Sequence, residues 1–276
     1  MTLKDLMTTI RKEFPEITTG DASLILSDIL DIPKLELLLR GNRETTPEET
    51  AETLRAFQRR TKGEPIQYIT GKAYFRNLAL KVGPGVLIPR PETETMVDIA
   101  IEVAPPNPKI CDLGTGSGAV AIAMATEIKG ASVAAVDISP KALEYTRKNI
   151  YENNAENIRT IQADLLKPFK KNQFDIITAN LPYVSDYLFE QLPREVREFE
   201  PETALRAEEN GLELIRKTAE TAPPILNPNG TVIFEISPEQ TNDTLEILKS
   251  ARFEETEIRK DLAGKNRFAI GKLTRH

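Results

Sequence analysis

The sequence of 276 residues is poor in the residue types on which several common chemistries depend. It has one histidine, His276, at its very end, and one cysteine, Cys111. A histidine-based triad, an imidazole general base and an HExxH metal site are therefore excluded from the body of the chain, and no intramolecular disulfide can form. Cys111 stands in a predicted buried strand, which indicates core packing. We expect chemistry that uses neither histidine nor a bound metal.

Long apolar runs are also missing. No stretch approaches the roughly 20 apolar residues that a membrane-spanning helix needs, and the first residues, MTLKDLMTTIRKEF, carry charges where a signal peptide has an apolar centre. We therefore expect a cytoplasmic protein that does not enter a membrane. The formal net charge of −6 disfavours binding that depends on neutralising nucleic-acid phosphates, although local basic patches leave RNA open as an acceptor.

The first part of the chain predicts a small helical domain over residues 1–72. A proline at the first helical position follows the N-cap Thr46, Glu49 completes a capping box, and Gly63 can end the helix. Three further apolar stretches have helical character, at 3–10, 22–30 and 33–39. We interpret this domain as one that docks a substrate and carries no chemistry of its own.

The pattern then changes to extended segments. Residues 74–82 and 86–87 flank Gly83-Pro84-Gly85, which predicts a β-hairpin linker over residues 73–92.

From residue 93 to 276, helical and strand patterns alternate, which predicts a catalytic domain of the α/β class with a mostly parallel sheet and helices on both faces. The helices are expected at 93–104, from about 118, and at 140–149; the strands are expected at 109–113, 131–137, 158–162, 174–179, 231–236, 254–259 and 267–271. The last two strands are so close in sequence that we expect an antiparallel hairpin at one edge of the sheet.

A glycine-rich turn follows the first strand of this domain. The turn is Gly114-Thr115-Gly116-Ser117-Gly118, and a helix begins directly after it. Glycines let the backbone approach a ligand closely. The turn lacks the Gly-Lys-Ser/Thr of a phosphate-binding P-loop and differs in spacing from the dinucleotide fingerprint. It therefore predicts a nucleoside-type site of another kind.

The next two strands end in polar residues that suit a nucleoside. Asp137 closes the second strand, where a carboxylate can accept hydrogen bonds from both ribose hydroxyls. Asp164 and Leu165 close the third, where a short polar side chain can meet an adenine amino group and a leucine can cover the ring. Taken singly, either aspartate could instead cap the helix that follows it. The ordered set resembles the class I S-adenosylmethionine methyltransferases, which implies a Rossmann-like sheet of seven strands and S-adenosylmethionine as cofactor.

The fourth strand is followed by Asn180-Leu181-Pro182-Tyr183. An amide nitrogen has a delocalised lone pair and is too weak an acid to lose a proton near pH 7, so a methyltransferase must position it instead. The Asn180 oxygen and a backbone carbonyl near Leu181 can accept its two N–H bonds, and the Tyr183 ring can pack on the planar group. Pro182 keeps Leu181 extended. We expect Asn180 and Tyr183 to be catalytic and residues 180–183 to bind the acceptor.

This tetrapeptide resembles the Asn-Pro-Pro-Tyr motif of methyltransferases that act on amino groups of adenine, cytosine or glutamine. Leu181 departs from the usual first proline, and the tetrapeptide is similar to the version found in ribosomal RNA adenine dimethyltransferases. On this motif alone, the acceptor stays open.

Segments that precede the glycine-rich turn narrow the choice of methyl acceptor. Residues 65–71 and Leu87-Ile88-Pro89-Arg90-Pro91-Glu92-Thr93-Glu94 resemble the release-factor glutamine methyltransferase family, also called HemK or PrmC. Later matching segments are 200–201, 204–205, 211–212, 228–230, 234–236, Gln240 and 261–264. The resemblance implies a protein-(glutamine-N5) methyltransferase that modifies the Gly-Gly-Gln motif of peptide chain release factors and so supports translation termination.

The same resemblance implies contacts for particular residues. The cofactor would be contacted by Gly114 to Gly118, Asp137, Leu165 and Asn180, and the glutamine by Asn180 to Tyr183. Arg90 and Glu92 fit a structural ion pair as well as they fit direct contact with substrate or cofactor.

Three other functions are consistent with parts of the sequence. Similar enzymes modify a glutamine of a large-subunit ribosomal protein, but their linker reads Arg-Ser-Pro. Leu181 would suit a ribosomal RNA adenine N6-methyltransferase. A non-catalytic protein could keep the fold and bind a partner through its helical domain, since a fold does not prove activity.

Overall fold

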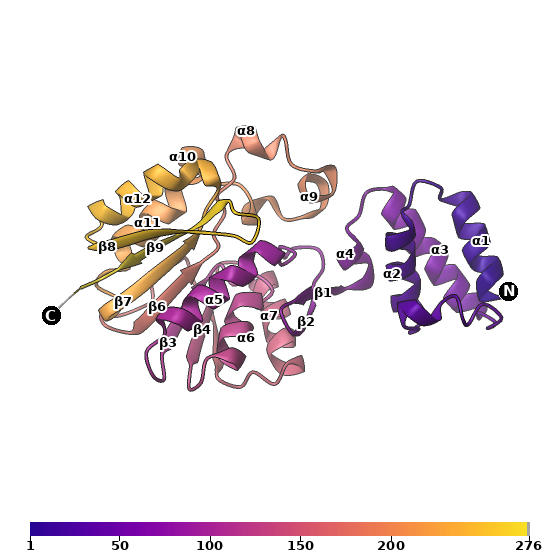
Figure 1. Cartoon of the computed structure of the whole chain (residues 1–276), viewed down its shortest axis with the longest axis horizontal. Coiled ribbons are helices and arrows are strands. Elements are labelled where there is room, and N and C mark those ends of the chain that lie inside the picture. Colours follow the sequence, from indigo (N-terminus) through magenta and orange to yellow (C-terminus); the bar gives the residue numbers. More distant parts are fainter. Residues whose placement is uncertain (275–276) are drawn as a thin grey trace. The chain divides into compact units, whose positions relative to one another are not determined.

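The computed structural model describes residues 1–274, and the chain divides into two compact units (Figure 1). The first comprises Met1–Lys72 and Pro193–Phe199, and the second comprises Ala73–Leu192 and the chain from Glu200 onward. His276 lies outside the described residues.

The first unit is helical. Its longest helix begins with the expected capping box, in which the Thr46 hydroxyl accepts from the Glu49 N–H (3.1 Å) and the Glu49 carboxylate accepts from the Thr46 N–H (2.9 Å). Gly63, just after the helix, has a left-handed φ of +92°. Four helices pack around a core that includes Leu3, Leu6 and Phe57. They are α1 (Leu3–Glu13), α2 (Thr19–Ile29), α3 (Pro47–Thr61) and α4 (Ile66–Thr70), and α9 (Arg194–Phe199) also belongs to this unit.

The prediction of a helix over residues 33–39 is wrong. The chain makes a single 3-10 turn at Lys34–Glu36, and of the four leucines in this stretch only Leu37 is buried. Leu35, Leu38 and Leu39 are 81 to 91% exposed. A short helix needs a packed apolar face to be stable in water, and one buried leucine does not provide it.

The hairpin turn is also not where the sequence pattern placed it. Strands β1 (Lys72–Phe75) and β2 (Leu78–Lys81) are joined by Arg76 and Asn77, so the turn expected at Gly83 to Gly85 is wrong. Arg76 has a φ of +51°, and its N–H donates to the Glu94 carboxylate (2.8 Å). Its guanidinium pairs with Asp98 and Glu127. Ion pairs formed by distant residues therefore hold a turn that has no glycine to mark it.

The second unit is built on one seven-stranded sheet with the order β5-β4-β3-β6-β7-β9-β8 (Figure 1). The first five strands in this order are parallel, and β9 lies antiparallel between β7 and β8. The expected parallel sheet with an antiparallel hairpin at one edge is therefore confirmed. The strands are β3 (Lys109–Leu113), β4 (Ser132–Asp137), β5 (Ile158–Gln162), β6 (Phe174–Ala179), β7 (Leu226–Glu235), β8 (Glu255–Lys260) and β9 (Asn266–Lys272).

Helices cover both faces of this sheet and give it two cores. Neighbouring residues of β3 face opposite cores, because Ile110 packs with residues of α5 and α6 and the fully buried Cys111 packs with residues of α11 and α12. No helix within residues 1–274 is long and apolar enough to cross a membrane. The helices of this unit are α5 (Glu94–Val103), α6 (Ala119–Glu127), α7 (Pro140–Glu152), α8 (Asp186–Phe189), α10 (Glu208–Gly211), α11 (Glu213–Thr221) and α12 (Thr241–Ser250).

The strand order reverses between β3 and β6, which are neighbours in the sheet. Ligands of open α/β sheets bind at the carboxyl ends of the strands at such a point. Here the two strand ends come very close, because a Cβ on Gly114 would lie 3.3 Å from the Asn180 carbonyl oxygen and 3.1 Å from a methyl group of Leu181. Gly114 also has a left-handed φ of +66°, so both its backbone and its lack of a side chain are required.

Asn149 of α7 ties β2 to the glycine-rich turn, and we expect its removal to be costly. Its buried amide accepts from Lys81 N–H (2.6 Å) and donates to the carbonyls of Lys81 (3.0 Å) and Ser117 (2.8 Å). Asn149→Ala leaves three backbone groups without partners and should lower the free energy of unfolding by about 3 kcal/mol in urea titrations. Asn153→Ala, which removes a partly exposed amide that bonds to Ala79 and Asn149, should cost about 1 kcal/mol. Equal losses would contradict this role.

Candidate active site

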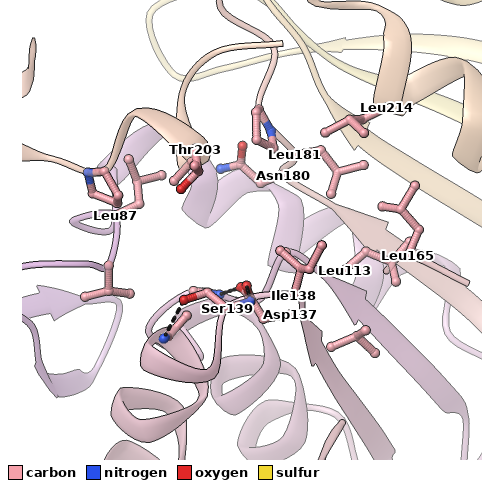
Figure 2. Close-up of a pocket in the computed structure, with 18 of the residues that line it drawn as sticks. Leu87, Leu113, Asp137, Ile138, Ser139, Leu165, Asn180, Leu181, Thr203 and Leu214 are labelled. Carbon is pink, nitrogen blue, oxygen red and sulfur yellow. Dashed lines mark hydrogen bonds between the residues drawn. The ribbon is translucent and has the colours of Figure 1, made fainter. Parts of the chain in front are cut away.

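A cavity of about 170 Å³ lies at the carboxyl ends of β3, β4, β5 and β6. Figure 2 shows Asp137 and Ser139 on one wall, with Asn180 and Thr203 across the opening. Several residues that the sequence singled out line this cavity together: Gly114, Gly116, Asp137, Asp164, Leu165, Asn180, Leu181 and Pro182.

Three residues of the glycine-rich turn do not line the cavity. Thr115 is buried and donates its hydroxyl to Asp112 (2.7 Å), and the Ser117 carbonyl accepts from Asn149. Gly118 has a φ of +85°, and a Cβ there would lie 3.0 Å from Thr146. These residues shape the turn, and Gly114 and Gly116 are the ones that reach the cavity wall.

Asp137 is held by backbone N–H groups on both of its oxygens. One oxygen accepts from Gly116 (2.9 Å) and the other from Ser139 (2.9 Å), as Figure 2 shows. Burial raises the pKa of the Asp137 carboxyl, and the N–H groups oppose this effect by stabilising the charge. A carboxylate oxygen has capacity for further hydrogen bonds, so Asp137 can also accept from hydroxyl groups in the cavity.

A second carboxylate, Asp112, is buried beneath the turn. It accepts from the hydroxyls of Thr115 (2.7 Å) and Thr178 (2.8 Å). Desolvation raises its pKa to about 6, and the nearby negative charge of Asp137 adds to the shift. Asp112 thus supports the turn from below, and it does not line the cavity.

One end of the cavity is apolar. Leu113, Leu165 and Leu214 lie together there in Figure 2. Leu165 has a φ of +51°, which is uncommon for a side chain of this size and is typical of residues held in place by a functional site. Asp164 beside it pairs with Lys167 and is partly exposed. Apolar side chains beside one polar group suit a flat heteroaromatic ring.

A smaller cavity of about 60 Å³ shares Leu87, Asn180, Leu181 and Ala204 with the first. Tyr183, absent from the lining of the large cavity, lines the small one together with Arg90 and Glu235. The Tyr183 hydroxyl donates to Glu235 (3.2 Å), and burial raises the pKa of Tyr183. Asn180 therefore borders both cavities. A group bound in the large cavity and a group bound in the small one would both lie next to the Asn180 side chain.

Arg90 forms an ion pair, but with Glu200 and not with Glu92. Glu200 is buried, and its two oxygens accept from the Arg90 guanidinium (2.5 Å) and from the Ile88 N–H (3.0 Å). The pair fixes the segment before α5 to the segment after α9 within the second unit. Arg90 also borders the small cavity, so the pair shapes that wall.

No site residue was predicted within residues 200–214, although the family resemblance included 200–201, 204–205 and 211–212. Pro201, Thr203, Ala204 and Leu214 line the large cavity, yet this stretch shows no regular periodicity. A detectable signal was Gly211, whose φ is +85° and whose Cβ would lie 1.9 Å from the Tyr183 carbonyl oxygen. Gln240 completes this contact by donating to the carbonyls of Tyr183 (3.0 Å) and Asn210 (2.9 Å).

Within residues 1–274, no three His, Cys, Asp or Glu side chains are grouped so that they could hold a metal ion.

Both the helical N-terminal part and the α/β part of the chain match known protein families. Residues 105–265 match the family model of a methyltransferase domain, and residues 11–71 match that of a PrmC N-terminal domain. The release factor glutamine methyltransferase of Thermodesulfovibrio yellowstonii is 37% identical over 254 residues, which cover 91% of each chain. That of Koribacter versatilis is 34% identical over 99% of each chain.

Among solved structures, a methyltransferase from Pyrococcus furiosus is similar, with a TM-score of 0.55 and 20% identity. The similarity covers 83% of this chain and all of that one. It supports the class I methyltransferase fold.

The raised pKa of Asp112 predicts a pH dependence of stability. Because its pKa rises from 3.8 to about 6 on folding, the folded protein favours the protonated form, and this contribution to stability is lost as the pH rises from about 4 through about 6. The loss is about 3 kcal/mol. Asp112→Asn, which cannot ionise, should gain that much stability relative to wild type across this range in urea titrations. A difference between the two proteins that does not change with pH would contradict the assignment.

Proposed function

Because this chain belongs to the release factor glutamine methyltransferase family, we propose that it methylates the side-chain amide nitrogen of the glutamine in the Gly-Gly-Gln motif of peptide chain release factors, with S-adenosylmethionine as methyl donor. The observation that carries the proposal is the position of Asn180, which borders two adjoining cavities. In this proposal the large cavity holds the cofactor, the small cavity admits the glutamine side chain, and the protein meets its release factor partners in the cytoplasm.

The lining of the large cavity fits S-adenosylmethionine. We assign the ribose hydroxyls to the Asp137 carboxylate, which two backbone N–H groups already hold in place. The adenine is assigned to the apolar end, with Leu165 against the ring and Asp164 near its amino group. Gly114 and Gly116 let the backbone come close to the ligand. When bound, the cofactor supplies a methyl carbon on a positively charged sulfur.

The acceptor is positioned by residues 180–183. The Asn180 side-chain oxygen and the Leu181 backbone carbonyl are assigned to the two N–H bonds of the glutamine amide, which aims the nitrogen at the methyl carbon. The Tyr183 ring is assigned to the wall against which the planar amide packs. As the bond from nitrogen to the methyl carbon forms and the bond from that carbon to sulfur breaks, positive charge would develop on the nitrogen, and the fixed oxygens would stabilise it. One N–H proton would then be released to water, leaving the neutral methylated amide.

Leu181 does not require a nucleic-acid acceptor. Its side chain is buried and packs against Gly114, so the position normally held by proline is filled by an apolar contact that closes the junction of β3 and β6. This packing accounts for the leucine, which was the one feature that favoured an RNA adenine methyltransferase. Release factor glutamine methyltransferases also align with this chain over 91 to 99% of both proteins.

Mass spectrometry of a purified bacterial release factor, incubated with this protein and S-adenosylmethionine, tests the proposal. We expect one added methyl group, located by peptide mapping on the glutamine of the Gly-Gly-Gln motif. Asn180→Ala should transfer on the order of a hundredfold more slowly, because it removes one of the two groups that position the amide. Methylation of ribosomal RNA or of a ribosomal protein in place of the release factor would refute the proposed substrate, and transfer to none of them would favour a non-catalytic protein.

A second experiment tests the assignment of Asp137. Asp137→Ala removes both hydrogen bonds to ribose and also frees the Gly116 and Ser139 N–H groups. We expect the Kd for S-adenosylmethionine to rise at least about a hundredfold in calorimetry, since hydrogen bonds to charged groups contribute about 1.5–3 kcal/mol each and two are lost. Asp164→Ala, which changes a partly exposed side chain, should have a smaller effect. An unchanged Kd in Asp137→Ala would count against the ribose assignment.

A further inference from the structure

Asn180 is the first residue of the tetrapeptide 180–183, which we call the acceptor tetrapeptide. Its side chain is one of three, from three different parts of the chain, that form a line of hydrogen bonds. Thr93 precedes α5, Asn180 follows β6, and Glu235 ends β7. The Thr93 hydroxyl donates to a Glu235 oxygen (2.7 Å), and the Asn180 side-chain N–H donates to the Thr93 hydroxyl (3.3 Å). Thr93 and Glu235 are only 4% and 3% exposed. The line therefore runs from the buried interior to the side chain that borders both cavities.

The chemistry of these groups fixes the direction of every bond in the line. An ionised carboxylate can only accept, so the single hydroxyl proton of Thr93 must point to Glu235. The Thr93 oxygen then offers only lone pairs to Asn180, which must present its NH₂ group to Thr93. The Asn180 oxygen is left on the other side of the amide, and within the described residues it accepts no hydrogen bond.

We propose that Thr93 and Glu235 are positioning residues that set the orientation of the Asn180 amide, so that its oxygen and not its NH₂ group is available to the acceptor amide. The inference rests on the proposed function and adds two residues to it. With the opposite orientation, the Asn180 NH₂ group would face the NH₂ group of the substrate, and neither could accept. An asparagine at this position is useful only if something determines which way its amide points.

Glu235 also connects the two ends of the acceptor tetrapeptide. One of its oxygens accepts from Thr93 and so acts on Asn180, and the other accepts from the Tyr183 hydroxyl (3.2 Å). Burial raises the pKa of the Glu235 carboxyl, and the hydrogen bonds from the two hydroxyls and the positive charge of Arg267 oppose part of this rise. A buried carboxylate is costly to a fold, and its use here is to impose one direction on the hydrogen bonds.

Thr93 is the better residue for a test, because it lines neither cavity. Thr93→Val keeps the shape of the side chain and removes the hydroxyl, whereas Thr93→Ser keeps the hydroxyl. Glu235→Gln replaces a pure acceptor by a group that can donate to Thr93, which allows the whole line to reverse. Thr244→Val is the matched control, because the Thr244 hydroxyl is buried in α12 and makes no hydrogen bond within the described residues.

The assay is methylation of the release factor, with kcat, KM and the Kd for S-adenosylmethionine measured for each variant. We expect Thr93→Val and Glu235→Gln to lower kcat on the order of ten- to a hundredfold, while the Kd for S-adenosylmethionine stays within about twofold, because only the orientation of Asn180 is lost. Thr93→Ser should recover most of the loss, and Thr244→Val should have the wild-type kcat.

A double-mutant cycle separates orientation of Asn180 from a merely structural role. If Thr93 acts through Asn180, Thr93→Val should lower kcat no further in an Asn180→Ala background. Additive losses would overturn the inference. A wild-type kcat in Thr93→Val would also overturn it, and so would a loss of kcat in Thr93→Ser as large as that in Thr93→Val. If Thr93→Val does not fold, the same cycle with Thr93→Ala decides, because Glu235 also contacts Tyr183 and its variants do not act on Asn180 alone. Failure of the wild-type protein to methylate the release factor would instead refute the proposed function.

Discussion

The close approach of two strand ends at Gly114 is the constraint on which the site depends. With no Cβ and a left-handed backbone, Gly114 lets the end of β3 lie against the Asn180 carbonyl and the Leu181 side chain at the end of β6. Any larger residue would push the two ends apart and separate the cavity at the glycine-rich turn from the acceptor tetrapeptide. Methyl transfer requires donor and acceptor atoms in near contact, and under the proposed assignment this junction is what brings them together.

Around this junction, two buried carboxylates and one partly buried carboxylate fix groups that carry no charge. Asp112 accepts from two threonine hydroxyls beneath the turn, Asp137 from two backbone N–H groups, and Glu235 from Thr93 and Tyr183. Burial raises the pKa of all three, which shows that each is held at a cost in solvation. The benefit is rigidity, since an ionised carboxylate accepts only and leaves its neighbours one hydrogen-bonding arrangement.

Chain segments that show no pattern of their own complete the site. Residues 200–214 give the large cavity one of its walls, and they are fastened by contacts with distant residues: Glu200 to Arg90 and to the Ile88 N–H, and Gly211 against the Tyr183 carbonyl. Gln240 bridges the same carbonyl and that of Asn210. Residues 180–183 are thus held in place by residues that no local periodicity would select.

The sequence by itself determined the α/β class, the positions of nearly all sheet strands, the edge hairpin and the capped helix that begins after Thr46, because these depend on local periodicity, capping and turn residues. It also predicted that Asp137, Asn180 and the glycine-rich turn lie close together, since strand ends of a parallel sheet meet at one edge. Tertiary structure alone decided the turn at Arg76, the lack of a helix at residues 33–39, and which turn residues reach the cavity. It also decided the partners of Asn180, because Thr93 and Glu235 lie 87 and 55 positions away in the chain and only packing of α5, β6 and β7 brings them together.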